Sequence, residues 1–159
     1  MKTGTIVIYT DGSCNPTYRI GGWAAILFIA EKKIILSGME RQTTHQRMEL
    51  QAVIKGFEYL AHTNLLTRPV ELYTDSQYVC GLPARKTKLK ASGFSSARNL
   101  PVRNADLVRE LIAYIERMNV QFIKVKSHQK EGTRNFNREA DKLARKIVRE
   151  MITKELLKG

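Results

Sequence analysis

The tripeptide Tyr-Thr-Asp occurs twice in the sequence, ending at Asp11 and at Asp75, and each copy closes a short apolar run. Both runs are rich in β-branched and aromatic residues and are followed by a turn signal or a helix start, which is typical of strands. Because neighbouring strands of an open α/β sheet end at one edge, the repeat predicts that the two acids face each other. A single Asp after a strand is more often a turn residue or a helix N-cap, so the repeat alone leaves both interpretations open.

The first third of the chain is predicted to form three consecutive antiparallel strands, at about residues 5–10, 22–29 and 33–37. A helix is expected next, because Thr43 and Gln46 form a capping-box pattern and apolar residues then recur at helical spacing from Leu50 to Leu60. Glu49 lies in its second turn. The strand that ends in Asp75 follows this helix.

The second half is predicted to contain a short helix directly after Asp75 and then a basic stretch punctuated by Pro83, Gly93 and Pro101, which should protrude. Helical periodicity at about 107–118, a strand at about 120–125 and a last helix from about Asn137 complete the pattern. The last helix is expected to bury a face that runs from Phe136 to Met151.

Length and composition favour one domain over residues 1–159, with a core at about 5–150 and a helical tail at 151–159. The longest apolar run, GGWAAILFIA, is too short to span a bilayer and no signal peptide is visible, so we expect a soluble cytoplasmic protein without membrane contact. Cys14 and Cys80 are too few for a disulfide framework and are expected to be reduced. We also expect a monomer that needs no small-molecule cofactor.

The chain is strongly basic, with 27 Lys and Arg against 15 Asp and Glu and a formal net charge of +12. Such an excess favours a polyanionic partner, and nucleic acid is the first expectation. The charge is concentrated between Gly81 and Ala105, a stretch without any acid that contains Arg85, Lys86, Lys88, Lys90, Arg98 and Arg103.

Four acids come from four different predicted elements: Asp11 and Asp75 follow strands, Glu49 lies on the first long helix, and Asp141 lies near the start of the last helix. Each alone is equally compatible with a turn, a cap or a solvated helix face. The flanking segments YTDGSCNP, TTHQRMELQAV, YTDSQYV, VKSH and NREADKLA, in this order, closely resemble ribonuclease H of the type-1 cellular kind over roughly residues 5–148.

The resemblance implies a five-stranded mixed α/β sheet, three antiparallel strands and then two parallel ones, with helices on both faces and a basic handle. It also implies an endoribonuclease that hydrolyses the RNA strand of RNA:DNA hybrids, leaving 5′-phosphate and 3′-hydroxyl ends. Asp11, Glu49, Asp75 and Asp141 are implied as ligands of two Mg²⁺ ions, for which Mn²⁺ could substitute, because all-oxygen sites suit these cations. His128, on the loop before Asp141, is implied in proton transfer or product release.

The same resemblance implies contacts with the hybrid. Glu49, Gln77 and the backbone near Cys14 match contacts to the ribose 2′-hydroxyl, and Thr44 and Asn104 match contacts to a DNA phosphate, although both could simply cap helices. Lys86, Lys88, Lys90 and Phe94 are expected to bind the DNA strand from the handle. This handle departs from the family because Arg85 and Leu89 stand where relatives carry Trp, and the turn CNPTYRIGG (residues 14–22) is also altered.

Two other functions remain open from the sequence. Another nuclease or strand transferase of the same superfamily, of the resolvase or transposase type, would use similar acids on a similar sheet. A non-catalytic module that binds hybrid or double-stranded RNA would keep the basic stretch without the chemistry. The RMEL and TDSQYV contexts argue against the first alternative, and the presence of all four acids argues against the second.

Overall fold

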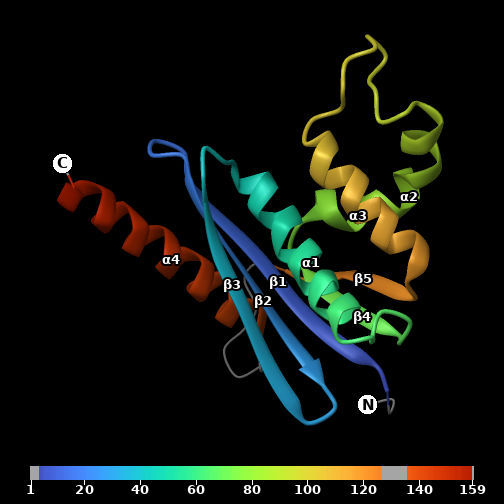
Figure 1. Ribbon diagram of the computed structural model, residues 1–159, viewed down its shortest axis with the longest axis horizontal. Helices are drawn as coiled ribbons and strands as arrows, with labels where there is room; N and C mark the ends of the chain where they lie inside the picture. Colours follow the sequence, from blue (N-terminus) through green and yellow to red (C-terminus); the bar gives the residue numbers. More distant parts are fainter. Residues whose placement is uncertain (1–3, 127–135, 159) are drawn as a thin grey trace.

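The computed structural model describes residues 4–126 and 136–158. Its strands form one five-stranded mixed sheet in the order β3-β2-β1-β4-β5 (Figure 1). The elements are β1 (Ile6–Asn15), β2 (Ile20–Ile29), β3 (Lys32–Arg41), β4 (Val70–Thr74) and β5 (Val120–Lys124). The first three strands are antiparallel, whereas β4 runs parallel to β1 and β5 parallel to β4, which confirms the predicted fold class.

Helices cover both faces of this sheet: α1 (His45–His62), α2 (Gln77–Ala91) and α3 (Ala105–Arg117) precede α4 (Phe136–Lys158) in the chain. Side chains of a strand alternate between the two faces. Ile8 and Leu27 accordingly belong to the main core beneath α1 and α3, while Ile26 packs against Ala140 and Ala144 of α4. Figure 1 shows α4 on the side of the sheet away from α1 and α3.

The first three strands are longer than predicted. The ladder between β1 and β2 continues from Val7 to Asn15, and the ladder between β2 and β3 ends at Arg41. Small and polar residues such as Gly12 and Ser13 do not look like strand formers, but cross-strand pairing keeps them extended. The turn between β1 and β2 is therefore short, and Asn15 Oδ1 closes it by accepting hydrogen bonds from the backbone of Thr17 and Tyr18.

Two helix predictions are also wrong in detail. The N-cap of α1 is Thr44, whose hydroxyl accepts a hydrogen bond from Arg47 N at 3.2 Å, while Thr43 is buried one residue earlier. The helix after Asp75 is not short, because α2 continues through Pro83 to Ala91. Leu82 and Leu89 are both buried in the core, and this packing holds the helix on either side of the proline.

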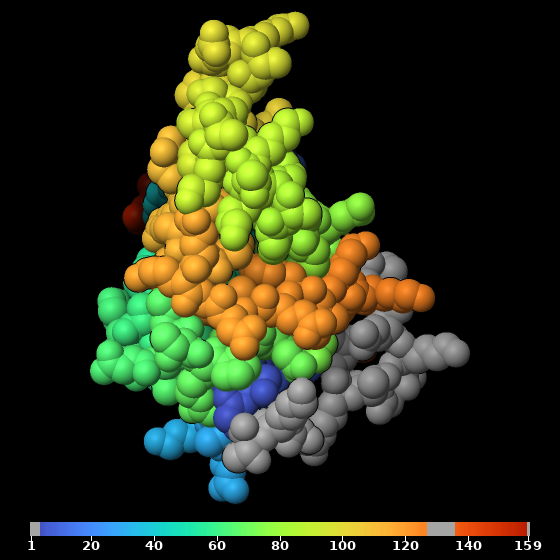
Figure 2. Space-filling view, turned by 90° about the vertical axis from the view of Figure 1, so that its right-hand side faces the viewer, coloured from blue at the N-terminus to red at the C-terminus, as the bar shows by residue number. Residues whose placement is uncertain are grey.

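The basic stretch projects from the body of the protein as the sequence predicts. Figure 2 shows residues of about 80–105, in yellow-green, rising above the rest of the molecule. None of the helices in the described part of the chain is long and apolar enough to cross a membrane. In α4, Ala140 and Ala144 are buried as expected, whereas Met151 is only half-buried, and the helix continues without a break to Lys158.

Candidate active site

The two Tyr-Thr-Asp segments lie side by side in the sheet. The parallel register pairs Ile6 with Val70 and Tyr9 with Tyr73, and the two Tyr rings stack with their centroids 4.9 Å apart. The same offset places Asp11 opposite Asp75. β4 ends at Thr74 while β1 continues to Asn15, so the two carboxylates meet just beyond the end of β4, beside the second half of β1.

Glu49 of α1 joins this pair because α1 packs very closely on β1. A Cβ atom at Gly12 would lie only 2.5 Å from the backbone N of Glu49 and 2.5 Å from the carbonyl carbon of Met48. Only glycine leaves room for this approach. Carboxylate oxygens of Asp11, Glu49 and Asp75 consequently all lie within 4.8 Å of one another.

These acids are close together and poorly solvated. Asp11 is 4% exposed. Burial, a hydrogen bond with Asp141 and the charges of Asp75 and Asp141 raise its pKa to about 9, although the Gly12 N–H bound to Oδ1 at 2.9 Å opposes the rise. Burial also raises the pKa of Glu49; His45 opposes this rise and Asp75 adds to it. The surroundings therefore disfavour the ionised form of Asp11 and Glu49 in the protein alone.

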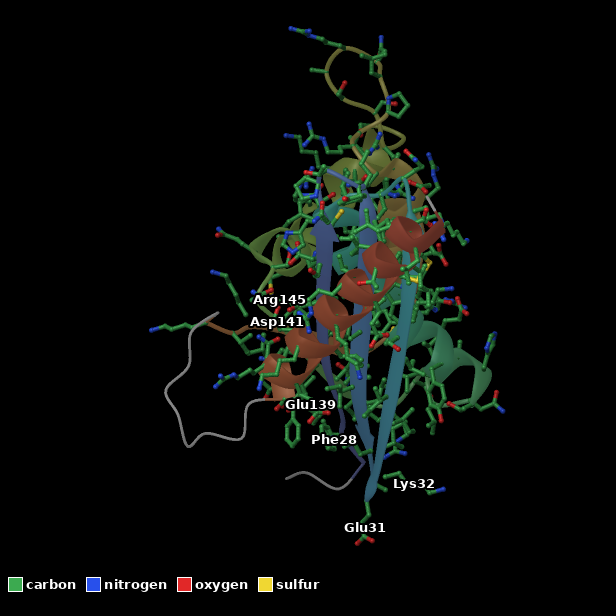
Figure 3. The ribbon with its side chains drawn as sticks, turned by 90° about the vertical axis from the view of Figure 1, so that its left-hand side faces the viewer. Phe28, Glu31, Lys32, Glu139, Asp141 and Arg145 are labelled. Carbon is green, nitrogen blue, oxygen red and sulfur yellow. The ribbon has the colours of Figure 1, made fainter. Side chains whose placement is uncertain are left out.

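Asp141 reaches the same site from the opposite face of the sheet. It helps to raise the pKa of Asp11 but lies outside the set of three mutually close carboxylates. Its Oδ1 accepts a hydrogen bond from Arg145 Nε at 3.1 Å, one turn further along α4 (Figure 3). The helix comes close enough because a Cβ at Gly22 would lie 2.6 Å from the carbonyl oxygen of Ala144.

The carboxylates fit a divalent metal ion. Three oxygen donors converge within 4.8 Å, and two unit charges at that distance repel by about 3 kcal/mol at an effective dielectric constant near 20. A bound cation would remove this repulsion and offset the cost of ionising the buried Asp11. An all-oxygen set suits hard cations such as Mg²⁺ or Mn²⁺ better than zinc, which favours nitrogen and sulfur ligands. Asp141 is placed to join the set if it leaves Arg145.

Two of the predicted contacts to the hybrid, Gln77 and Cys14, follow acids of the cluster closely in the chain. Gln77 is exposed at the start of α2, two residues after Asp75, and Cys14 lies on the part of β1 that extends beyond β4. The Cys14 thiol donates to Thr43 O at 3.6 Å, and the contact expected from the backbone near Cys14 stays a prediction. Its burial raises the pKa of the thiol, and both cysteines are free.

Thr44 and Asn104 occupy the N-cap positions of α1 and α3, as the competing interpretation of these residues anticipates. Asn104 makes no capping hydrogen bond with its side chain. Its amide nitrogen instead donates to Gln46 Oε1 at 2.9 Å. The neighbouring Arg47 binds both carboxylate oxygens of Asp106, at 3.0 and 2.8 Å, and thereby ties α1 to the start of α3. Sequence analysis missed this link because its partners are far apart in the chain.

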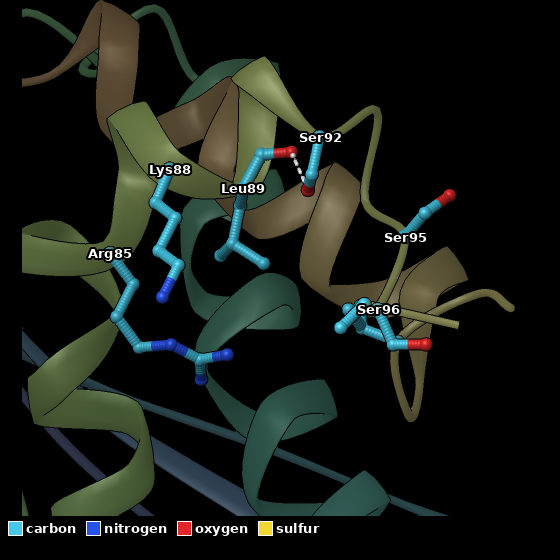
Figure 4. A pocket seen from close by; sticks show the side chains of 8 residues that line it. Arg85, Lys88, Leu89, Ser92, Ser95 and Ser96 are labelled. Atoms are coloured by element: carbon cyan, nitrogen blue, oxygen red, sulfur yellow. Dashed lines mark hydrogen bonds between the residues drawn. The ribbon is translucent and has the colours of Figure 1, made fainter. Parts of the chain in front are cut away.

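The handle residues are not equivalent in the structure. Lys88 and Arg85 point into a hollow of about 460 Å³ that is also lined by Ser92, Ser95 and Ser96 (Figure 4). Lys90, by contrast, is bound to Glu116 of α3 at 2.5 Å, an acid outside the basic stretch. Lys86 also lies near this acid and helps to lower its pKa.

Phe94 does not fit the predicted stacking role. Its side chain is 7% exposed and belongs to the main core, and the guanidinium of Arg109 lies 4.4 Å from the ring centroid. No open ring face is left for a base, so this prediction is corrected: Phe94 anchors the handle to the body of the protein. His128 lies outside the described residues.

Comparison with known proteins gives a consistent result. The family model described as "RNase H" matches residues 3–149. A protein of Caulobacter vibrioides named "Ribonuclease HI" is 42% identical over 93% of this chain and 95% of its own length. A protein of Caldicellulosiruptor saccharolyticus named "Ribonuclease H" is 36% identical over 92% of this chain and 97% of its own length.

Solved structures share the fold. LC9-RNase H1, described as a type 1 RNase H with the type 2 active-site motif, aligns with a TM-score of 0.77 at 23% identity, covering 93% of this chain and 74% of that one. A foamy viral protease-reverse transcriptase in complex with an RNA/DNA hybrid aligns with a TM-score of 0.68 at 21% identity, covering 89% of this chain and 19% of that one.

Proposed function

The chain belongs to the ribonuclease H family, and we propose that it hydrolyses the RNA strand of RNA:DNA hybrids at the site formed by Asp11, Glu49, Asp75 and Asp141. The observation that carries this proposal is the convergence of three carboxylates within 4.8 Å beside β1, just beyond the end of β4. The family is metal-dependent. We propose two Mg²⁺ ions as the natural cofactor, with Mn²⁺ as a substitute.

The four acids would hold the cations, and each has a different setting in the protein. Asp11 accepts a hydrogen bond from the N–H of Gly12, and the close packing of α1 on β1 fixes the position of Glu49. Asp141 accepts a hydrogen bond from Arg145 and would have to exchange this partner for the cation. Bound divalent ions supply the positive charge that activates water and stabilises the attacking and leaving oxygens of a phosphodiester. The protein's own contribution is to place the donors on rigid elements before substrate arrives.

Discrimination between RNA and DNA requires groups that sense the ribose 2′-hydroxyl. We assign this role to Glu49, to Gln77 at the start of α2 and to the backbone at Cys14, on the part of β1 that extends past β4. Thr44 and Asn104, near one another at the starts of α1 and α3, are proposed to bind a phosphate of the DNA strand. Lys86, Lys88 and Lys90 would bind the DNA strand from the handle, with Lys88 contributing most because Lys90 already binds Glu116. His128 is proposed to assist proton transfer or product release.

The alternatives from the sequence are not favoured. A resolvase-type or transposase-type nuclease is inconsistent with relatives named ribonuclease H that are aligned over more than nine tenths of this chain. A binding module without catalytic activity would gain nothing from a buried acid such as Asp11, because ionising this carboxyl costs folding free energy when no cation is bound.

The test is a cleavage assay on an RNA:DNA hybrid, duplex DNA and duplex RNA of one sequence, with Mg²⁺ and with chelator. We expect cleavage of the RNA strand of the hybrid alone, only with metal, and with 5′-phosphate ends. Asp75→Asn should abolish cleavage and leave hybrid binding within a few fold, because the handle lies apart from the metal site. Substantial turnover by this variant would exclude the assignment.

A further inference from the structure

The helix α4 carries a continuous stripe of cations along its outer surface. Five of its basic residues follow one another at spacings of three or four, or as direct neighbours, and so share one side of the helix: Arg138, Lys142, Arg145, Lys146 and Arg149. All five are exposed, and together with Asp141 they line a hollow of about 460 Å³. We refer to these five residues as the α4 stripe.

Two of the four acids of α4 bind residues outside the stripe. Glu139 binds Lys33 at 2.9 Å and Glu155 binds Arg41, so both are engaged by the β3 edge of the sheet. Glu150 lies 3.9 Å from Lys146 and offsets one cation of the stripe in part. Within the described residues, no ion pair involves Lys142 or Arg149. Among the described residues, Lys142 and Arg149 are therefore exposed stripe cations that form no ion pair with an acid.

The stripe is continuous with the proposed active site. Arg145 belongs to the stripe and also binds Asp141, one of the four acids, at 3.1 Å (Figure 3). From Arg138 to Arg149 the stripe is roughly 16 Å long, given a rise of 1.5 Å per residue, and it could follow several consecutive phosphates of a nucleic acid strand. It lies on the face of the sheet opposite to α1 and α3, and hence away from the handle (Figure 1).

We propose that the α4 stripe is a second nucleic-acid-binding surface, which holds the phosphate backbone of the RNA strand beside the active site. This inference rests on the proposed function. The stripe begins beside Asp141, so the strand that passes it is taken to be the RNA strand that the proposed active site cleaves. The handle and the stripe would then hold the two strands of the hybrid from opposite sides of the acids. Exposed cations that contact phosphates act through counterion release, so the contribution should depend strongly on salt.

The experiment measures hybrid affinity in EDTA, where cleavage cannot occur, at four salt concentrations. The test variant is Lys142→Gln/Arg149→Gln, and the control is Lys154→Gln/Lys158→Gln, which removes the same charge from the same helix away from the stripe. Each lost phosphate contact lowers the slope of log affinity against log salt by roughly 0.9. We expect the test variant to lose about 1 to 2 from this slope and at least fivefold in affinity at low salt, and the control to match the wild type.

A second arm identifies the strand. Neutral methylphosphonate linkages are placed in the RNA strand or, separately, in the DNA strand of the same hybrid. We expect RNA-strand neutralisation to weaken wild-type binding by several fold and to have much less effect on the test variant, whereas DNA-strand neutralisation should weaken both equally. If neutralising the RNA phosphates and removing the stripe cations are non-additive in this way, the stripe cations contact the RNA phosphates directly.

An unaltered slope for the test variant would overturn the proposal, as would non-additivity confined to the DNA strand. Circular dichroism melts of both variants check that the helix is intact, and exchange of these outward side chains for Gln should leave the fold in place. Wild-type cleavage of the hybrid with Mg²⁺ is measured in parallel. Cleavage without a binding role for the stripe would refute this inference alone, while absence of cleavage would refute the proposed function.

Discussion

Replacing Asp11 by Asn should make the metal-free protein more stable while abolishing its activity. Asp11 is 4% exposed, and its pKa is raised to about 9, chiefly by burial and further by Asp141 and Asp75. At neutral pH the wild-type protein must therefore either ionise this group at a cost or take up a proton. An Asn side chain of the same shape avoids both costs and can still accept the hydrogen bond from Gly12 N–H.

The size of the effect follows from proton linkage. Because the folded-state pKa is raised, the carboxyl group costs no folding free energy below its ordinary pKa of 3.8, and it destabilises the fold progressively as pH rises from there through about 9. At pH 7 this penalty is at most about 4 kcal/mol, at 1.36 kcal/mol per pH unit. The Asn amide must still be desolvated, so we expect a gain of roughly 2 to 4 kcal/mol, equivalent to about 5 to 15 °C in Tm for a chain of this length.

The assay is chemical or thermal unfolding in EDTA at several pH values between 5 and 9, for the wild type and Asp11→Asn. The stability difference should grow with pH over this window. Asp106→Asn is a control of opposite sign, because Arg47 holds the pKa of Asp106 below its usual range. The stability from Asp106 is fully present above its unfolded pKa of 3.8, so this variant should be destabilised by a nearly constant amount between pH 5 and 9.

Two results would refute the reasoning about Asp11. One is a stability difference that does not change between pH 5 and 9, and the other is a variant that is less stable than the wild type in EDTA at pH 7. Adding Mg²⁺ or Mn²⁺ gives a further check. The metal should stabilise the wild type through its carboxylates and stabilise Asp11→Asn much less, so that the difference narrows.

Three further predictions concern other parts of the site. Gly12→Ala should lower the cleavage rate at least about 100-fold and cost roughly 1 to 3 kcal/mol in unfolding free energy, because the new Cβ would meet the α1 backbone at 2.5 Å. A folded variant that cleaves the hybrid at the wild-type rate would contradict this prediction. Lys88→Ala should weaken hybrid binding at low salt more than Lys90→Ala, since Lys90 is engaged by Glu116; equal losses would show that this ion pair does not matter. His128→Ala should slow steady-state turnover more than it weakens binding, and unchanged turnover across pH 6 to 9 would remove this residue from the reaction.

Much of the fold could be predicted locally. The alternation of apolar residues, the doubled Tyr-Thr-Asp and the helical spacing after Glu49 depend on neighbours within a few positions, and these set the type and order of the elements. The four acids were identified through family motifs carried by the same short segments. The Arg145 contact also has a local signal, since Arg145 lies four residues after Asp141 on a predicted helix.

Other features depended on partners distant in the chain. Polar residues at the end of β1 remain extended only because β2 pairs with them, and Pro83 stays within α2 because Leu82 and Leu89 are buried. Phe94 is covered by Arg109 rather than exposed. In each case the free energy of packing or pairing outweighs a local preference of about 1 kcal/mol or less, except for proline, where the local cost is larger.

The sequence by itself determined which acids the protein carries, on which elements they lie and that the surface is strongly basic. Tertiary structure alone decided that Asp11, Glu49 and Asp75 converge within 4.8 Å. It also decided how the handle cations differ within the described part of the chain: Lys88 lines the handle hollow, whereas Lys90 is bound to Glu116. The physical reason is that charges and close contacts act through space, so their effect depends on distances that only the packed chain sets.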